Sequence, residues 1–324
     1  MAQGIDPQQQ QEMVSEQGQI ELDSIFSTVA ANWFQLKSKS VTPDYAKDIW
    51  RSLDKDVFPS IGKIPVQEIK ARTIIEALEP IKARGALETV RRLVQRINEI
   101  MIYAVNIGLL DANPTSGVGM AFERPKKQNM PTLRPEELPK LMRTLIMSNL
   151  SVPTRCLIEL QLLTLVRPSE AAGARWAEID LDAKLWTIPA ERMKAKREHI
   201  VPLSPLALNI LEVMKPISAH RTYIFPSRNE PKHPMNSQTA NAALKRIGYG
   251  GKLFAHGLRS IASTAMNEAL FNADVIEAAL AHSDRNEIRR AYNRSNYLNL
   301  RKDLMNWWGQ YIYNMKTVNE GSLI

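Results

Sequence analysis

The side chains best suited to chemistry in this sequence are arginines and histidines that lie far apart along the chain. Arg167, in "LLTLVRPSEAAGARW", follows an apolar run, and Pro168 then ends one helix and begins another with Glu170 in its first turn. We expect Glu170 to hold the Arg167 guanidinium in one orientation, although an ordinary structural ion pair would have the same spacing. His256 and Arg259, in "HGLRS", are neighbours on one helix face. An arginine fork matches phosphate oxygens and a histidine can move a proton, so both pairs favour a phosphate-binding site; His256 alone also fits a core or surface histidine.

A tyrosine with basic neighbours occurs in "AHSDRNEIRRAYNRSNY", residues 281–297. A phenol with a pKa of about 10 is a poor nucleophile at neutral pH, so an attacking tyrosine needs positive charge and a proton acceptor close by. Tyr292 has basic residues on both sides, and His282 precedes it in the same stretch. Tyr292 is therefore a candidate nucleophile, with a buried aromatic ring as the alternative. Tyr297 is expected to face elsewhere and to pack.

The clearest β signal, "LWTIPAERMKAKREHIVPLS", consists of two short strand-like runs around a polar, basic turn. The cations Lys194, Lys196 and Arg197 all lie in this turn. Each of them could donate a proton in a reaction, or contact a phosphate and position it without taking part in the chemistry.

The charge balance favours a polyanionic partner, nucleic acid above all. The chain has 42 Lys and Arg against 34 Asp and Glu, a net charge of +8. A hydrophobic content of 44% over 324 residues is enough for two globular domains. No apolar run is long enough for a membrane span and the N-terminus has no export signal, so we expect a cytoplasmic protein with no membrane partner. The single cysteine, Cys156, excludes an internal disulfide and a Cys-rich metal site and is expected to lie in a core.

The sequence pattern predicts a mainly α-helical protein with two domains. Residues 1–20 form a polar, flexible lead-in, and residues 21–111 form a bundle of about four helices. Residues 112–133 form an interdomain linker with prolines and glycines, and residues 134–324 form a mixed α+β domain that is mostly helical with a small antiparallel sheet. Cations expected to contact nucleic acid lie on one face of the last bundle helix and in the linker: Arg91, Arg92, Arg96, Lys126 and Lys127.

Several of these segments occur in an order and spacing that resemble one enzyme family. The segments "VRPSEAAGARWAEID", "WTIPAERMKAKREHIVPLS", "HGLRS" and "LAHSDRNEIRRAYNR" are similar to those of the tyrosine site-specific recombinases, and within them the integrases of prophages and genomic islands. The resemblance covers the whole second domain, and the helical bundle resembles the family's SAM-like core-binding domain. It implies a DNA strand-transferring enzyme that needs no metal ion and no cofactor. Integrases of this group usually carry a further N-terminal domain that binds arm-type DNA sites, and this chain is expected to lack it.

The resemblance also implies a role for each candidate residue. Tyr292 would attack a scissile DNA phosphate and form a 3′-phosphotyrosyl link. Arg167 and Arg259 would bind the non-bridging oxygens, and Lys194 would protonate the departing 5′ oxygen. Hydrogen bonds and proton transfer would come from two histidines, His256 and His282.

The partner that the resemblance implies is double-stranded DNA at attachment core sites. A homotetramer would form on the DNA through a Holliday junction, from protein that is monomeric when free. Resolution of chromosome dimers or a topoisomerase-like activity would use the same residues, and a DNA-binding relative without catalysis is a third alternative. The C-terminal segment either docks onto a neighbouring protomer or closes the chain's own core, through Trp307, Trp308, Tyr311 and Ile312.

Overall fold

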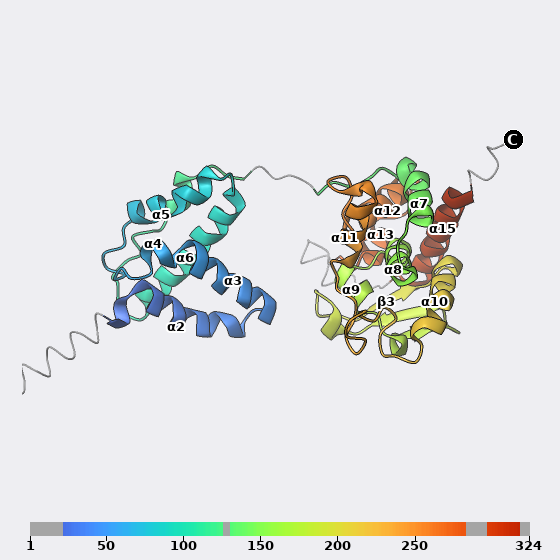
Figure 1. Ribbon diagram of the computed structural model, residues 1–324, viewed down its shortest axis with the longest axis horizontal. Coiled ribbons are helices and arrows are strands. Elements are labelled where there is room, and N and C mark those ends of the chain that lie inside the picture. The colour runs from blue at the N-terminus through green and yellow to red at the C-terminus, as the bar shows by residue number, and fades with distance from the viewer. Residues whose placement is uncertain (1–21, 126–129, 283–296, 318–324) are drawn as a thin grey trace, which may run out of the picture. The chain divides into compact units, whose positions relative to one another are not determined.

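The structure is a computed structural model that describes residues 22–125, 130–282 and 297–317. The chain divides into two compact units, Met1–Gln128 and Asn129–Ile324, which are drawn in Figure 1. Most of the described residues are helical, and the strands form one small antiparallel sheet, so the predicted fold class is confirmed.

The first unit is a helical bundle around one apolar core. Thr42 caps the N-terminus of the second helix: its side chain accepts a hydrogen bond from the Tyr45 backbone N–H, as expected of a threonine before a proline. The longest helix buries Leu93 and Ile97 at the expected helical spacing. The helices are α2 (Phe26–Lys39), α3 (Pro43–Asp56), α4 (Phe58–Ile61), α5 (Ala71–Ala83) and α6 (Leu87–Asn106), followed by the 3₁₀ turn η1 (Val118–Ala121).

The compact part of the first unit extends beyond residue 111. Val118 and Phe122 are buried against the bundle core, so the segment that contains η1 belongs to this unit rather than to an extended connection. The prolines and glycines of this segment predict irregular structure, but its apolar side chains Val118 and Phe122 are still buried in the core.

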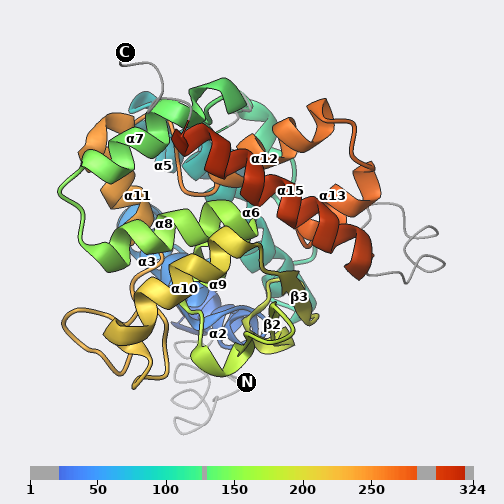
Figure 2. The ribbon, with the colours of Figure 1, turned by 90° about the vertical axis from the view of Figure 1, so that its right-hand side faces the viewer.

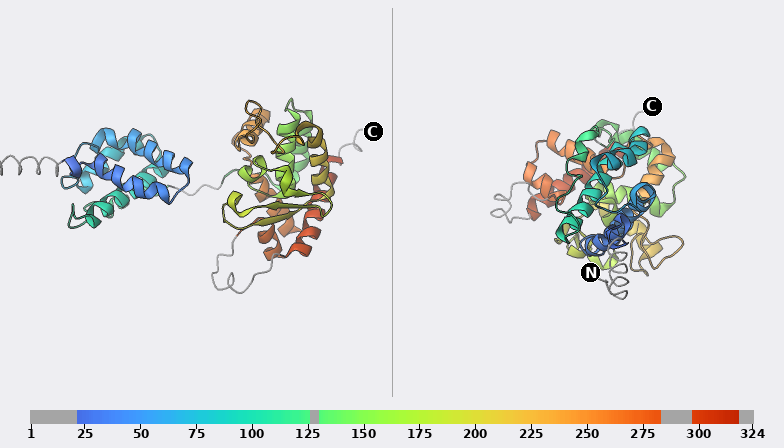
Figure 3. Two further views of the ribbon diagram at one scale, coloured as in Figure 1. Left: turned by 90° about the horizontal axis from the view of Figure 1, so that it is seen from below. Right: turned by 90° about the vertical axis from the view of Figure 1, so that its left-hand side faces the viewer.

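The second unit contains a small sheet within a helical layer. Strand β2 (Leu185–Ile188) pairs with β3 (His199–Pro202) in register Trp186 to Val201, which confirms the predicted strand pair. A short strand, β1 (Ile179–Asp180), was not foreseen and pairs with the other edge of β2; the sheet is seen as arrows in Figure 3. The remaining elements are η2 (Pro135–Glu137), α7 (Leu138–Met147), α8 (Val152–Thr164), α9 (Pro168–Ala172), η3 (Trp176–Glu178), η4 (Ala190–Arg192), α10 (Pro205–Ser218), α11 (Thr239–Leu244), the π-helical turn η5 (Lys245–Tyr249), α12 (Gly257–Glu268), α13 (Ala273–Ala279) and α15 (Leu298–Thr317).

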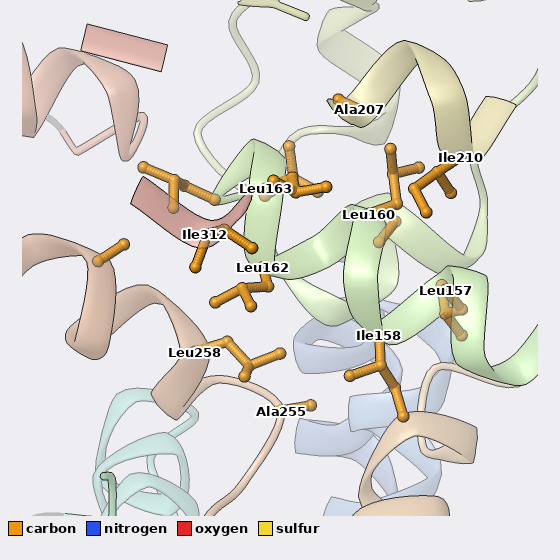
Figure 4. Packing of buried hydrophobic residues seen from close by; sticks show 14 of the residues in the cluster. Leu157, Ile158, Leu160, Leu162, Leu163, Ala207, Ile210, Ala255, Leu258 and Ile312 are labelled. Atoms are coloured by element: carbon orange, nitrogen blue, oxygen red, sulfur yellow. The ribbon is translucent and has the colours of Figure 1, made fainter. Parts of the chain in front are cut away.

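Helix α8 is the centre of this unit. It is buried along most of its length and contacts α10, α11, α12 and α15, and Figure 4 shows its leucines and Ile158 between Ile210 and Leu258. Cys156 lies in this core, as expected. Helices α12, α13 and α15 lie together on one side of the unit in Figure 2 and contact one another.

The C-terminal helix α15 packs onto its own unit. Trp308 and Ile312 are fully buried, and the Trp308 indole N–H donates a hydrogen bond of 2.8 Å to the Leu162 carbonyl of α8. Trp307 and Tyr311 are partly buried beside them. For the described residues the alternative of core closure is therefore confirmed, because indole and isoleucine side chains this deeply buried have no surface left for a neighbour.

No helix among the described residues is both long enough and apolar enough to cross a membrane.

Candidate active site

Arg167 and Glu170 form the first part of the site, at the start of α9. Helix α8 ends at Thr164 and Pro168 begins α9, which leaves Arg167 in extended conformation as the residue before the helix. The Glu170 carboxylate accepts the Arg167 backbone N–H at 2.7 Å and its guanidinium Nη1 at 3.0 Å. Glu170 is buried, and the Arg167 side chain retains 19% exposure. The predicted orienting contact is confirmed: a buried carboxylate fixes a guanidinium that still reaches solvent.

Arg259 is the second cation, and it lies almost fully buried on α12. Its Nη1 donates to the Leu165 carbonyl and its Nη2 donates to the Leu280 carbonyl at 2.5 Å. Burial, followed by the charge of Arg167, lowers the pKa of Arg259 to about 10, so its guanidinium group still carries a charge at neutral pH. Two neighbouring guanidinium groups can together bind one anion.

Two histidines stand beside the arginine pair. His256 precedes the first residue of α12, and burial, followed by the charges of Arg259 and Arg167, lowers the pKa of its imidazole. His256 is therefore neutral at pH 7 and able both to accept and to donate a proton. His282 places Nε2 at 3.1 Å from Arg259 Nη2 and Nδ1 at 2.8 Å from the Glu277 carboxylate. The structure thus brings Arg167, Arg259 and His282 together at the end of α13, where Arg167 donates to the Ala281 carbonyl and Arg259 contacts His282. The charges of both arginines act on His256.

The cations Lys194, Lys196 and Arg197 in the turn between β2 and β3 are exposed, and they differ in their relation to this group of residues. Lys194 is among the charges that lower the pKa of His256, whereas Lys196 and Arg197 are not. Lys194 therefore lies within electrostatic reach of the histidine.

Two further residues of the site, one half-buried and one buried, were not foreseen from the sequence. Arg192 donates from Nη2 to the Glu170 carbonyl at 2.6 Å and from Nη1 to the buried Glu178 carboxylate, so it supports the helix that carries Glu170. A side chain at Gly173 would meet the Arg192 guanidinium at 2.9 Å, which explains a glycine there. His199 on β3 is also buried, and the charges of Arg301, Arg259 and Arg167 all act on it. Neither residue has a sequence neighbour that reveals its partner.

The chain matches two family descriptions that together cover most of it. Residues 131–299 match the phage integrase family, and residues 26–121 match the phage integrase central domain. This chain belongs to the phage integrase family. The family resemblance that the four quoted segments indicate is therefore confirmed.

Relatives and solved structures agree with this integrase assignment. The chain is 57% identical to prophage integrase IntA of Escherichia coli (strain K12) over 324 residues, which cover 100% of this chain and 78% of that relative. It is 34% identical to the integrase of Enterobacteria phage P4 over 330 residues, 96% of this chain and 74% of that one. A lambda integrase tetramer bound to a Holliday junction has the same fold, with a TM-score of 0.69 and 15% identity over 89% of this chain and 84% of that one.

The basic face expected on α6 of the integrase is smaller than predicted. Arg91 and Arg92 are exposed, and each donates to Glu88. The prediction is wrong for Arg96, which is 8% exposed, donates to Ser52 Oγ of α3 and lies over the Tyr45 ring. Arg96 shares its helix face with Leu93 and Ile97, and α3 covers that face, so the hydroxyl and the ring replace solvent around the guanidinium.

Three of the predicted residues lie outside the described residues: the candidate nucleophile Tyr292 and the linker lysines Lys126 and Lys127.

Proposed function

We propose that this integrase cleaves and rejoins double-stranded DNA at attachment core sites through a 3′-phosphotyrosyl intermediate, and so integrates or excises a prophage or genomic island. The observation that carries the proposal is the convergence of Arg167, Arg259 and His282 from three separate elements into one cationic cluster. His282 is the last described residue before the segment that contains Tyr292. The nucleophile proposed from the sequence therefore follows the cluster directly along the chain.

The proposed reaction exchanges one phosphodiester bond for another. The Tyr292 phenol oxygen attacks the scissile phosphorus, a histidine of the cluster accepts the phenol proton, and the bond from phosphorus to the 5′ oxygen breaks. Arg167 and Arg259 bind the non-bridging oxygens, whose negative charge grows in the transition state. Attack by a 5′ hydroxyl of the partner strand reverses the step and releases the tyrosine. No bond energy is lost to water, so strand exchange needs no external energy source.

Lys194 is the proposed donor of the proton to the departing 5′ oxygen. Its charge acts on His256, which supports Lys194 over Lys196 and Arg197 for this role. An exposed hairpin turn can bring the ammonium group to a phosphate once DNA fills the site. Lys196 and Arg197 are then proposed contacts to the DNA backbone.

We also propose that the chemistry is independent of metal ions. Two guanidinium groups at one phosphate supply the positive charge that divalent cations supply in two-metal phosphoryl transfer. Loss of one well-placed donor costs roughly 2.7–4 kcal/mol of transition-state stabilisation, so replacing Arg167 or Arg259 should slow cleavage on the order of a hundredfold or more.

The proposed DNA complex uses both units and several copies of the chain. Residues 21–111 would form the core-binding domain and 134–324 the catalytic domain, joined by a linker within 112–133. Arg91 and Arg92 of the first domain and Lys126 and Lys127 of the linker are proposed contacts to DNA phosphates. Lambda integrase, which has the same fold, forms a dimer on a core site and a tetramer on a Holliday junction, which supports a tetramer of this chain on DNA. We propose that the free protein is a monomer.

A covalent-adduct experiment tests this function. The protein is incubated in EDTA with nicked duplexes cloned from the DNA that flanks its coding sequence, and the products are separated by denaturing electrophoresis. We expect a slowly migrating protein–DNA adduct that disappears in Tyr292→Phe and persists in the matched control Tyr297→Phe. An adduct that survives in Tyr292→Phe overturns the assignment of the nucleophile. DNA binding without any adduct would instead show a DNA-binding relative without catalysis.

A further inference from the structure

Two residues next to the arginine pair have a backbone conformation that side chains normally avoid. Leu165, the residue directly after α8, has φ 59° and ψ 14°. Ala281, two residues after α13, has φ 50°. This left-handed region suits glycine, because a Cβ atom comes too close to the neighbouring backbone there. Leucine and alanine hold this conformation only where the surrounding structure enforces it.

The surrounding hydrogen bonds do enforce it at Ala281. The Ala281 N–H donates to the Ala278 carbonyl at 3.1 Å and the His282 N–H donates to the Glu277 carbonyl at 3.0 Å. This pair of bonds is the Schellman ending of a helix, which requires a left-handed residue at the position of Ala281. The same ending places His282 immediately after the helix, beside Arg259.

Both left-handed residues present a carbonyl oxygen to an active-site arginine. The Leu165 carbonyl accepts Arg259 Nη1, and the Ala281 carbonyl accepts Arg167 Nη2 at 3.4 Å. Leu280 adds its carbonyl to Arg259 Nη2 at 2.5 Å. Each arginine is therefore held by a turn that belongs to another element of the fold: Arg167 by the end of α13, and Arg259 by the end of α8.

We propose that Leu165 and Ala281 are positioning residues, whose left-handed backbone aims two carbonyl oxygens at Arg259 and Arg167 and thereby sets the spacing of the guanidinium pair that binds the scissile phosphate. The proposal rests on the function proposed above. The carbonyl oxygens accept hydrogen bonds from Nη1 and Nη2 of Arg259 and from Nη2 of Arg167. The two turns hold a strained backbone conformation, and this conformation keeps the two guanidinium groups oriented.

The chain contains a matched control for Ala281 at the end of α12. Leu270 has φ 60°, its N–H donates to Asn267 and the Phe271 N–H donates to Met266, so the helix has the same Schellman ending. Leu270 is 91% exposed, and no described arginine donates to its carbonyl. A substitution at 270 therefore reproduces the backbone strain of a substitution at 281 without the contact to the active site.

The test compares valine, asparagine and glycine at position 281 with valine at position 270. Valine disfavours the left-handed region because it is β-branched, whereas asparagine enlarges the alanine side chain but tolerates this region, and glycine adopts it freely. For each variant we would measure the melting temperature, the affinity for the nicked duplex, and the rate of adduct formation at saturating DNA. Ala281→Val should reduce that rate on the order of tenfold or more at a DNA affinity within about twofold of wild type. Ala281→Asn, Ala281→Gly and Leu270→Val should keep at least half of the wild-type rate.

The outcomes separate this proposal from the proposed function. If wild-type protein forms no adduct, the function fails; if it does and Leu270→Val loses as much rate as Ala281→Val, the positioning role is overturned. A tenfold loss in Ala281→Asn also overturns it, because side-chain size and not backbone conformation would then be the cause. Should Ala281→Val not fold, the asparagine and glycine variants still decide: both must cleave, and both must melt at or above the wild-type temperature.

Discussion

His282 Nε2 lies 3.1 Å from Arg259 Nη2, and this contact fixes the proton on the histidine ring. A guanidinium N–H can only donate, so Nε2 must accept, and the hydrogen of the neutral ring is then on Nδ1. Nδ1 faces the Glu277 carboxylate at 2.8 Å, which accepts this hydrogen. The tautomer follows from these hydrogen-bond partners. It makes Nε2 the hydrogen-bond acceptor next to the arginine that is proposed to bind the phosphate.

Glu277 should therefore act on catalysis through the tautomer of His282 and not through its charge. Glu277→Gln removes the charge but keeps an oxygen that accepts the Nδ1 hydrogen, so cleavage should remain within about threefold of wild type. Glu277→Leu removes the acceptor and lets the ring change tautomer, and we expect a loss on the order of tenfold or more. Single-turnover cleavage rates at saturating DNA measure both variants. Equal rates for the glutamine and leucine variants would contradict the assignment.

Arg192 should be essential for the stability of the region around α9. Arg192→Met leaves the Glu178 carboxylate, with 7% side-chain exposure, without its cation, and such a buried charge costs about 3–5 kcal/mol. Urea unfolding at pH 7 measures this loss. The double variant Arg192→Met with Glu178→Gln should recover part of it, because the amide needs no counter-charge and its oxygen can still accept the Trp186 indole N–H. A double variant no more stable than Arg192→Met would show that lost packing, and not the carboxylate, is responsible.

Local sequence signals were sufficient for the parts of the site that depend on local geometry. Pro168 predicts the break between two helices, and Glu170, three residues after Arg167, predicts the orienting carboxylate. The apolar runs on either side of a basic turn likewise predict the β2–β3 pair.

Contacts between distant elements were not predictable in this way. Arg192 donates a hydrogen bond to Glu178, which lies before β1. The charge of Arg301, on the C-terminal helix, acts on His199. Helical spacing placed Arg96 on an exposed face, but Ser52 from another helix covers it. The left-handed turn at Ala281 could not be predicted, because no glycine stands there and the Schellman hydrogen bonds impose the conformation on alanine.

Arg91 and Arg96 should give opposite results although both lie on α6. Arg91→Ala removes an exposed cation, so DNA binding should weaken for all sequences, and the slope of log affinity against log salt should fall by about 0.9. Arg96→Met should leave that slope unchanged and lower the melting temperature instead, because Ser52 Oγ and the Tyr45 ring lose the guanidinium. Salt titrations of DNA binding and thermal unfolding measure the two effects. A reduced salt slope in Arg96→Met would restore Arg96 as a phosphate contact.

His199 should make the fold sensitive to acid. Burial, followed by the charges of Arg301 and Arg259, lowers the pKa of His199 to about 3, against 6.5 for the unfolded chain. Between these two values the unfolded state binds one more proton than the folded state, so the free energy of unfolding falls as the pH falls from 6.5 towards 3. The slope that one such group contributes is at most about 1.4 kcal/mol per pH unit. His199→Gln cannot take up this proton, and its stability should decrease less steeply than that of wild type over the same range. Urea unfolding at a series of pH values from 7 to 4 measures the two slopes, and identical slopes would show that His199 is protonated in the folded protein.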